Sequence, residues 1–428
     1  MTKKEAAARG RQNIRRHRLE NGLEVLLLPG SYAPLVAVDI WYRVGSRNET
    51  PGKSGFAHLF EHMMFQGSAN VGKAEHMKLI TDVGGSVNAS TSKERTNYYA
   101  VVPKNQLPLA LWLEADRMRS LAVTRENFEN ELAAVKEERR LRVDNAPYGP
   151  VMFELLDELF YREWPYKHSL IGSMADLNQA TFEDITAFHE RFYRPANAIL
   201  ALAGDFDPEA TLQLIETYFG DIPAGEAPPH ADFHESPRRE EARMEVADRF
   251  APLPAIAQAY HIPPYGHADY PAIELLEKIL FDGESARMNR RLIEKEQTAL
   301  HLFGGSDGKM GPGMFQIFAQ LNPNVSPQQL EASIAEEIDR VCREDISENE
   351  LLKTGNQMRA DLVSRMEQVL NQAEMMCLYT MAFDDPGRLF EEEESYQKVT
   401  AADIRRVANQ YLRPENRVVI HVMPGNGE

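Results

Sequence analysis

Residues Ser54 to Gln66 read S-G-F-A-H-L-F-E-H-M-M-F-Q and place two histidines and a glutamate close together. On an α-helix, positions four apart lie on one face, so His58 and His62 would point the same way about one turn apart. Two imidazoles in that relation suit the binding of one metal ion. Glu61 follows His58 by three residues and lies on the same side. The stretch therefore predicts a helix that binds a metal and holds a carboxylate beside it.

The other side chains of this stretch are apolar nearly all round, which predicts that the helix is buried. Core histidines satisfied by hydrogen bonds are the alternative interpretation. With 12 histidines in 428 residues, the pattern H-x-x-E-H rarely arises by chance. It is the inverse of the H-E-x-x-H zinc signature and occurs among metalloproteases. We therefore favour metal binding.

The composition is that of a globular protein, with 43% hydrophobic and 26% charged residues. The formal net charge of -18 argues against nucleic-acid binding, because phosphate would be repelled. Its two cysteines, Cys342 and Cys377, lie far from the histidine motif in sequence. A disulfide framework is excluded at that count, and a cysteine-bound zinc is not expected.

No stretch approaches the ~20 apolar residues of a membrane span, so we expect none in this sequence. The start, M-T-K-K-E-A-A-A-R-G-R-Q, has positive charge but no apolar core behind it and does not read as an intact secretory signal. We expect a cytoplasmic protein by default. The periplasm stays open, since a sequence from which a leader had been removed would look the same.

Hydrophobic periodicity predicts alternating strands and helices along the chain. Strands are expected at 17–29, 35–44 and 197–205, β structure at 87–103, and helices at 76–85, 105–120, 124–143, 149–161 and 181–192. Thr124 is a plausible N-cap of the helix that it opens. Residues 221–241 are rich in proline and charge without apolar periodicity, which predicts a linker.

Behind this linker the pattern of the first part begins again. Y-R-P-A-N-A-I-L-A-L at 193–202 resembles Y-L-R-P-E-N-R-V-V-I at 411–420. At nearly the same offset, H-L-F-E-H-M-M-F-Q-G at 58–67 lies over E-L-L-E-K-I-L-F-D-G at 274–283. Chance similarity between amphipathic helices is the alternative, but two separated matches at one offset favour duplication.

The repeat predicts an α+β protein of two homologous halves. In the alignment His58 falls on Glu274 and His62 on Lys278, so only the first half keeps the metal motif. We therefore expect an N-terminal zinc-binding catalytic domain over residues 1–220. After the linker, a homologous domain without the motif is expected over residues 242–428.

A catalytic zinc with two histidines needs a third protein ligand. The helix predicted at 124–143 offers four acidic candidates, Glu129, Glu131, Glu137 and Glu138. Glu131 and Glu138 are two turns apart on one face. In the repeat Glu131 lies opposite Glu350, whereas Glu138 lies opposite Gln357, and the carboxylate lost from the metal-free half is the natural ligand. We choose Glu138 as ligand and Glu131 as a partner holding a ligand imidazole; a solvated acidic helix face is the alternative.

Taken together, these motifs resemble the pitrilysin or insulinase-type zinc metallopeptidases. The resemblance is closest to the subgroup that includes mitochondrial processing peptidase β-subunits and their bacterial relatives. H-L-F-E-H matches the family's inverted motif, and Glu138 follows it at the family's spacing for the third ligand. V-N-A-S-T, P-Y-G, Y-R-P-A-N and the duplicated half extend the resemblance over nearly the whole chain. It implies an antiparallel-rich sheet packed with helices in each half.

The resemblance implies an endopeptidase for unfolded peptides or short polypeptides. His58, His62 and Glu138 would hold one Zn²⁺ per chain, with Glu61 as the general base. A purely structural zinc would want a fourth protein ligand and would not need Glu61. The peptide would add as a strand to a sheet edge at 87–91 and be bound at Asn88, Ala89 and Ser90.

The family encloses its substrate in a chamber formed by two such chains or one double-length chain. Its metal-free half usually supplies an arginine and a tyrosine, carried by S-R-L and a later A-Y, where this sequence has S-A-R-M and A-L-H at 285–288 and 299–301. This departure predicts a dimer with a paralogous subunit or a second copy that completes the site. The alternative function is a non-catalytic scaffold or assembly subunit of the same family, which would have no use for the two histidines and two glutamates.

Overall fold

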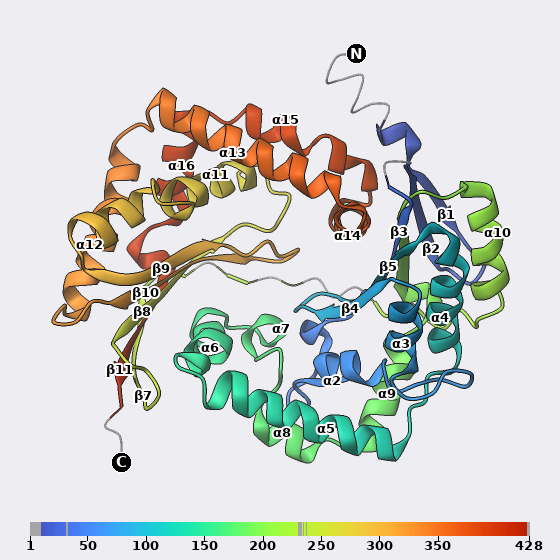
Figure 1. Cartoon of the computed structure of the whole chain (residues 1–428). Coiled ribbons are helices and arrows are strands. Elements are labelled where there is room, and N and C mark those ends of the chain that lie inside the picture. Colours follow the sequence, from blue (N-terminus) through green and yellow to red (C-terminus); the bar gives the residue numbers. More distant parts are fainter. Residues whose placement is uncertain (1–9, 31–32, 230–232, 234, 237, 426–428) are drawn as a thin grey trace. The chain divides into compact units, whose positions relative to one another are not determined.

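The structure is a computed structural model that describes residues 10–30, 33–229, 233, 235–236 and 238–425 (Figure 1). The chain forms two compact units. The first unit combines residues 1–137, 168–231 and 363–392, and the second combines 138–167, 232–362 and 393–428. No helix among the described residues is both long and apolar enough to cross a membrane.

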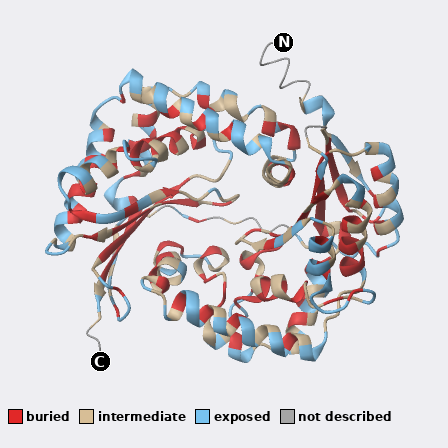
Figure 2. Cartoon of the chain, in the orientation of Figure 1, coloured by how far each residue is buried: buried red, intermediate tan, exposed pale blue. Residues whose placement is uncertain are grey.

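A six-stranded sheet forms the centre of the first unit. In spatial order its strands are β1 (Arg15–Arg18), β2 (Glu24–Pro29), β6 (Ala198–Gly204), β3 (Leu35–Tyr42), β5 (Thr96–Pro103) and β4 (Ser86–Thr91). Only β2 and β6 run parallel; the other neighbours are antiparallel. The strand β6 is buried along its whole length, and Figure 2 shows that buried residues concentrate in the strands of this sheet.

The single strand predicted over 17–29 is wrong, because the chain turns back within it. β1 and β2 form an antiparallel hairpin, and the amide of Gly22 donates to the carbonyl of Leu19 at 2.9 Å. Gly22 has a φ of 87°, which a residue without a side chain adopts readily. The dipeptide Asn21-Gly22 is a strong hairpin signal, and it outweighs the apolar run around it.

Helices cover both faces of this sheet. Figure 1 shows α4 on one side and α14 on the other, and each contacts β3 and β5. The helices whose bounds lie wholly or mainly in this unit are α2 (Phe56–Met63), α3 (Glu75–Asp82), α4 (Leu107–Ser120), α5 (Arg125–Arg139), α8 (Met174–Gln179), α9 (Phe182–Phe192), α10 (Pro208–Phe219) and α14 (Val369–Phe383).

The second unit contains a five-stranded sheet. Its order is β7 (Ala242–Asp248), β11 (Arg417–Pro424), β8 (Ala255–Ile262), β10 (Gly313–Leu321) and β9 (Ala299–Ser306). β7 and β11 are parallel and the other pairs antiparallel. Five strands of the first sheet, β2-β6-β3-β5-β4, correspond one to one with β7-β11-β8-β10-β9. In both sheets only the first two strands of this order are parallel. The predicted fold class, two α+β halves with antiparallel-rich sheets, is confirmed.

The helices of the second unit come from three parts of the chain. They are α6 (Leu156–Phe160), α7 (Trp164–Lys167), α11 (Tyr270–Phe281), α12 (Pro327–Arg343), α13 (Glu348–Glu367), α15 (Glu392–Gln397) and α16 (Ala401–Tyr411).

Both units also contain short 3₁₀ and π-helical segments. The 3₁₀ helices are η1 (Ser46–Asn48), η2 (Lys104–Gln106), η5 (Pro195–Asn197), η7 (Pro386–Phe390) and η8 (Pro414–Asn416), and the π-helical turns are η3 (Arg140–Asp144), η4 (Val151–Leu155) and η6 (Asn289–Lys295).

The two predicted helices at 124–143 and 149–161 are shorter than expected. α5 ends at Arg139, and the chain continues through η3 and η4 before α6 begins. In η3 the amide of Asn145 donates to the carbonyl of Arg140, five residues earlier, at 2.8 Å. A π-helical turn adds one residue to a helical turn, and an apolar pattern does not reveal it.

Two segments are exchanged between the sequence halves. Residues 138–167 belong to the second unit, where Leu156 and Phe160 of α6 share a core cluster with β8 and β11. Residues 363–392 belong to the first unit and supply α14. The compact units thus do not coincide with residues 1–220 and 242–428. The described part of the predicted linker has no helix or strand before β7 begins; residues 230–232, 234 and 237 lie outside the described residues.

A carboxylate is buried in the first unit on the face that α14 covers. Asp39 on β3 is 0% exposed, and it accepts hydrogen bonds from Trp41 Nε1 at 2.6 Å and Asn97 Nδ2 at 3.0 Å. Burial raises the pKa of Asp39 from 3.8 to about 8, because the charged form loses its hydration. The folded protein therefore keeps a proton on Asp39 at neutral pH that the unfolded chain releases.

This proton makes stability depend on pH. The stabilisation from protonated Asp39 is present at low pH and is lost as the pH rises towards about 8. We expect this group alone to lower the free energy of unfolding of metal-free protein by about 2–3 kcal/mol between pH 6 and pH 9. Asp39→Asn should show a correspondingly smaller fall, measured by urea denaturation with chelator present. Equal losses in the two proteins would contradict the assignment.

Candidate metal centre

The start of α2 is fixed by a buried carboxylate. Glu49 accepts hydrogen bonds from the amides of Gly55 at 2.9 Å and Ala57 at 2.7 Å, and His168 Nε2 lies 3.0 Å from its Oε2. His168 Nε2 also lies 2.9 Å from the carbonyl of Ser46, so this nitrogen is the donor. Burial raises the pKa of Glu49. A carboxylate here satisfies amides that begin the helix and have no partner within it.

Close packing against another loop also sets this end of α2. Gly55 precedes the helix with a φ of 91°, and a Cβ there would lie 2.6 Å from the carbonyl oxygen of Ile171. Only glycine combines that backbone angle with that contact. The sequence S-G-F-A-H therefore places the first histidine at a defined distance from a rigid turn.

One face of α2 is buried and the opposite one is not. Phe56, Leu59, Phe60 and Met63 are buried, and the ring of Phe60 packs on that of Tyr193 at 4.4 Å between centroids. The three polar residues of the motif, His58, Glu61 and His62, are only partly buried. The prediction of a helix buried all round is wrong. The polar side chains lie on the accessible face, where a ligand can reach them.

The second contributing helix is α5. The amide of Asn127 donates to Thr124 Oγ1 at 3.2 Å, which confirms the predicted N-cap. The helix runs without a break from Arg125 to Arg139 and carries both Glu131 and Glu138. The division between the two compact units falls inside this helix, immediately before Glu138. Both glutamates are therefore positioned by one rigid element.

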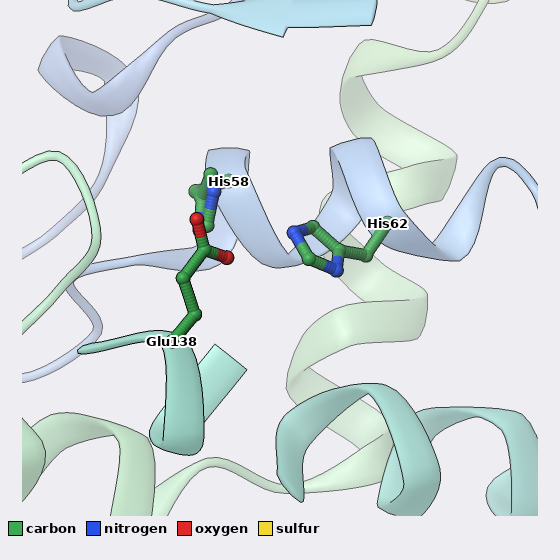
Figure 3. A group of neighbouring side chains, drawn as sticks. All are labelled: His58, His62 and Glu138. Carbon is green, nitrogen blue, oxygen red and sulfur yellow. The ribbon is translucent and has the colours of Figure 1, made fainter. Parts of the chain in front are cut away.

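The two helices bring the predicted ligands together. His58, His62 and Glu138 each offer a ligand atom, and these atoms all lie within 4.8 Å of one another (Figure 3). Around a tetrahedral zinc, neighbouring ligand atoms lie about 3.4 Å apart. The observed group meets this requirement with small side-chain adjustments, and two imidazoles with one carboxylate form a donor set that zinc accepts. Among the described residues no other such cluster occurs.

Two further contacts bear on these ligands. His62 Nδ1 lies 3.3 Å from Glu131 Oε2, the contact predicted for Glu131. With the proton on Nδ1, the ring presents Nε2 to a metal. Glu138 also pairs with Arg142 one turn later at 2.9 Å, and the Arg142 side chain is 71% exposed. Such an exposed pair contributes little, so it does not prevent Glu138 from binding a metal.

The predicted general base is tied to the sheet. Thr91 Oγ1 donates a short hydrogen bond to Glu61 Oε2, which links α2 to the end of β4. The sequence indicated Thr91 only as part of the strand motif V-N-A-S-T and did not predict this contact. The hydroxyl fixes one carboxylate oxygen of Glu61, so the orientation of this carboxylate depends on β4.

β4 lies at the edge of its sheet. It pairs with β5 on one side, and no described residue pairs with its other side. Asn88 is exposed and Ala89 is buried, and the amide of Ala89 donates to Asn88 Oδ1 at 2.9 Å. The Ser90 hydroxyl is occupied within the sheet, where it donates to Asn97 Oδ1 at 2.7 Å. A peptide at this edge would therefore bind mainly to backbone groups of β4 and less to its side chains.

The equivalent positions of the second unit are built differently. Lys278, which replaces His62 in the repeat, pairs with Asp282 and Asp361 at 2.7 and 2.6 Å. Arg287, from the S-A-R-M stretch, forms two hydrogen bonds to Glu350 at 2.8 and 2.7 Å. Ion pairs thus stand where the first unit has its imidazole and its carboxylate partner.

Comparison with known proteins identifies relatives of both halves of the chain. Residues 25–174 match the family described as Insulinase (Peptidase family M16), and residues 179–358 match the Peptidase M16 inactive domain. The zinc protease PqqE of Helicobacter pylori is 31% identical over 409 residues, which cover 95% of this chain and 92% of that protein. The uncharacterized zinc protease SCO5738 of Streptomyces coelicolor is 25% identical over 421 residues, 95% of this chain and 89% of its own.

A solved structure has the same fold. The crystal structure of a protease from Helicobacter pylori superimposes with a TM-score of 0.92 at 30% identity, covering 96% of this chain and 99% of that one. The match extends over both units, including the half without the histidine motif. The chain therefore belongs to the M16 family of insulinase or pitrilysin-type peptidases.

Proposed function

We propose that this protein is a zinc-dependent endopeptidase that hydrolyses unfolded peptides or short polypeptides. The observation that carries the proposal is the meeting of His58, His62 and Glu138 within 4.8 Å, with Glu61 on the same helix as the histidines. A structural metal site would not need a carboxylate at the position of Glu61. Relatives named as zinc proteases support the same conclusion.

Each polar residue of the site has a distinct role in this mechanism. His58, His62 and Glu138 would hold one Zn²⁺, and Glu131 orients the ring of His62. When bound, zinc supplies Lewis acidity, which promotes ionisation of water and polarises the peptide carbonyl. Glu61 removes the proton from the attacking water and then delivers a proton to the leaving amine. The hydrogen bond from Thr91 keeps the Glu61 carboxylate in place during both transfers.

The substrate would bind in an extended conformation along β4. An edge strand offers amides and carbonyls in register to an added strand. Asn88, Ala89 and Ser90 are the positions expected closest to the peptide. Because backbone groups make these contacts, recognition would depend little on sequence and would require an unfolded segment.

We further propose that the active assembly is a dimer with a paralogous subunit or a second copy, enclosing the substrate in a chamber. The departure at 285–288 and 299–301 from the family pattern supports a need for a second chain. We also propose that the chain is close to the mitochondrial processing peptidase β-like subgroup, on the basis of the H-L-F-E-H motif and the spacing to Glu138.

A non-catalytic scaffold is the second candidate. It is favoured by one observation, the match of residues 179–358 to a domain described as inactive. That domain lies in the half without the histidine motif, and the first half keeps every residue that the chemistry requires. Zinc content and cleavage of a fluorogenic peptide, by the chain alone and with any co-purifying chain, distinguish the two functions.

Replacing the general base should separate metal binding from catalysis. Glu61→Gln keeps the size of the side chain but cannot accept a proton, so we expect normal zinc content and a loss of about 10²–10⁴ in kcat. His62→Ala, as the control, should lose both zinc and activity. Zinc by plasma emission spectroscopy and cleavage of a fluorogenic peptide measure the two effects. Full activity in Glu61→Gln would show that another group is the base.

The choice of third ligand can be tested against its neighbour in sequence. Glu138→Gln removes a ligand charge, and we expect the affinity for zinc to fall by at least about tenfold, as for other metal-site substitutions. Glu137→Gln changes an exposed residue of the same helix by the same atoms and should leave affinity unchanged. Competition with a chromogenic zinc chelator gives both affinities. A larger effect of Glu137→Gln would move the ligand to that residue.

A further inference from the structure

The end of β4 is held by a guanidinium from the neighbouring strand connection. Arg95 Nη1 donates to the carbonyl of Ser90 at 3.0 Å, to the Ser90 hydroxyl, and to Asn97 Oδ1 at 2.8 Å. Arg95 lies just before β5, and Ser90 and Asn97 face each other in the β4–β5 register. One side chain therefore fixes both the backbone and the hydroxyl of Ser90.

Arg95 is half-buried and packs against buried residues of the sheet. Its guanidinium lies 4.7 Å from the centre of the Trp41 ring. Trp41 and Asn97 each donate to a different oxygen of Asp39 on the central part of the sheet. Burial lowers the pKa of Arg95, and nearby acidic groups oppose this shift, Asp39 most, then Glu374 on α14 and Glu61 on α2. Movement of Arg95 would disturb several contacts at once.

The next residue of β4 leads to the active site on the opposite face. Successive side chains of a strand point to opposite sides, so Ser90 faces the α14 side and Thr91 the α2 side. Thr91 donates to Glu61, the proposed base. A continuous path of contacts thus runs from Asp39 through Asn97, Arg95 and the Ser90–Thr91 backbone to the carboxylate that moves protons.

Stabilising the hairpin alone does not require this arrangement. The turn between β4 and β5 already has a partly buried ion pair, Arg47 to Glu94 at 3.0 Å, and the Arg47 amide donates to the carbonyl of Lys93 at 2.9 Å. A half-buried guanidinium costs free energy unless it is hydrogen-bonded, and the hydrogen bonds of Arg95 go to Ser90 and Asn97. β4 has a strand neighbour on one side only, so the position of its end depends on the pairing with β5, on the Thr91–Glu61 contact and on Arg95.

We propose that Arg95 is a positioning residue that holds the Ser90–Thr91 end of β4, and through Thr91 the Glu61 carboxylate, in the geometry required for peptide cleavage. The inference rests on the proposed peptidase function. Arg95 forms hydrogen bonds to Ser90 and Asn97 and none to the histidines, so it acts on the site through the end of β4 and not as a metal ligand.

Three variants test the proposal in the zinc-loaded, full-length protein. Arg95→Gln removes the guanidinium, and Ser90→Ala removes one of its acceptors. Arg47→Gln is the matched control, because it removes the Arg47–Glu94 ion pair at the turn of the same hairpin without touching β4. We expect kcat of Arg95→Gln on a fluorogenic peptide to fall at least about tenfold, since small misplacements of reacting groups have large effects on rate. KM should change less than threefold, because residues 86–89 still bind the peptide.

Ser90→Ala should lower kcat in the same direction by a smaller factor, and Arg47→Gln should keep the kcat of the parent protein. Zinc content should be equal in all four proteins. Amide hydrogen exchange supplies a readout independent of cleavage: Arg95→Gln should exchange faster over residues 86–91, and Arg47→Gln should not. If Arg95→Gln does not fold, the test rests on Ser90→Ala alone. A Ser90→Ala protein with unchanged kcat and unchanged hydrogen exchange over residues 86–91 would then overturn the proposal.

Failure of the proposed function gives a different result. If the parent protein binds zinc but cleaves no peptide, alone or with a partner chain, the peptidase proposal falls and hydrogen exchange decides whether Arg95 holds β4. Exchange over 86–91 that is the same in Arg95→Gln and the parent protein overturns the Arg95 inference whatever the activity. Equal loss of kcat in Arg95→Gln and Arg47→Gln also overturns it, because the effect would then be general loosening of the hairpin.

Discussion

The candidate metal centre depends on α2 and α5 meeting at one point, although the two helices begin about seventy residues apart in the sequence. α2 cannot slide along its axis, because Glu49 binds the amides of Gly55 and Ala57 and is itself bound by His168. A buried carboxylate is tolerated here since three donors surround it. This fixed end sets the position of the histidines. α5 contributes two carboxylates: Glu131 contacts His62, and Glu138 lies with both histidines in the candidate ligand group.

The sheet contributes the second constraint, through its unpaired edge. An exposed strand edge is a hazard in a globular protein because it can pair with other chains. β4 reduces this hazard by being only six residues long and mostly polar. It is then held from both faces, by Thr91 with Glu61 and by Ser90 with Arg95. The strand edge proposed to bind a peptide is thus unpaired and still fixed next to Glu61, the proposed base.

Much of this site could be predicted because its chemistry is local in sequence. The spacing of His58, Glu61 and His62 reports the geometry of a helix directly, and the repeat distinguished Glu138 from Glu131. The hairpin at Asn21-Gly22 was also present in the sequence, but the apolar residues on both sides outweighed it in the interpretation. The accessible face of α2 was missed because hydrophobic content does not tell which face has a neighbour.

Other features depend on contacts that no local pattern contains. The π-helical turns after Arg139 arise where the chain leaves one core for another. Arg95 reads as one more charged residue of a turn, and only the fold brings it against Trp41 and Ser90. Thr91 likewise becomes important only when α2 lies beside β4. Interactions across a sheet join residues whose spacing in sequence has no fixed period.

The exchange of segments between the halves has a consequence for how the protein is made. The first unit is covered on one face by α14, which is translated only after residue 369. During synthesis the face of the sheet that carries Asp39 and Trp41 therefore lacks this cover until most of the second half has left the ribosome. Cutting the chain at the linker would therefore not separate the two units. Each fragment would lack a segment that belongs to its own compact unit.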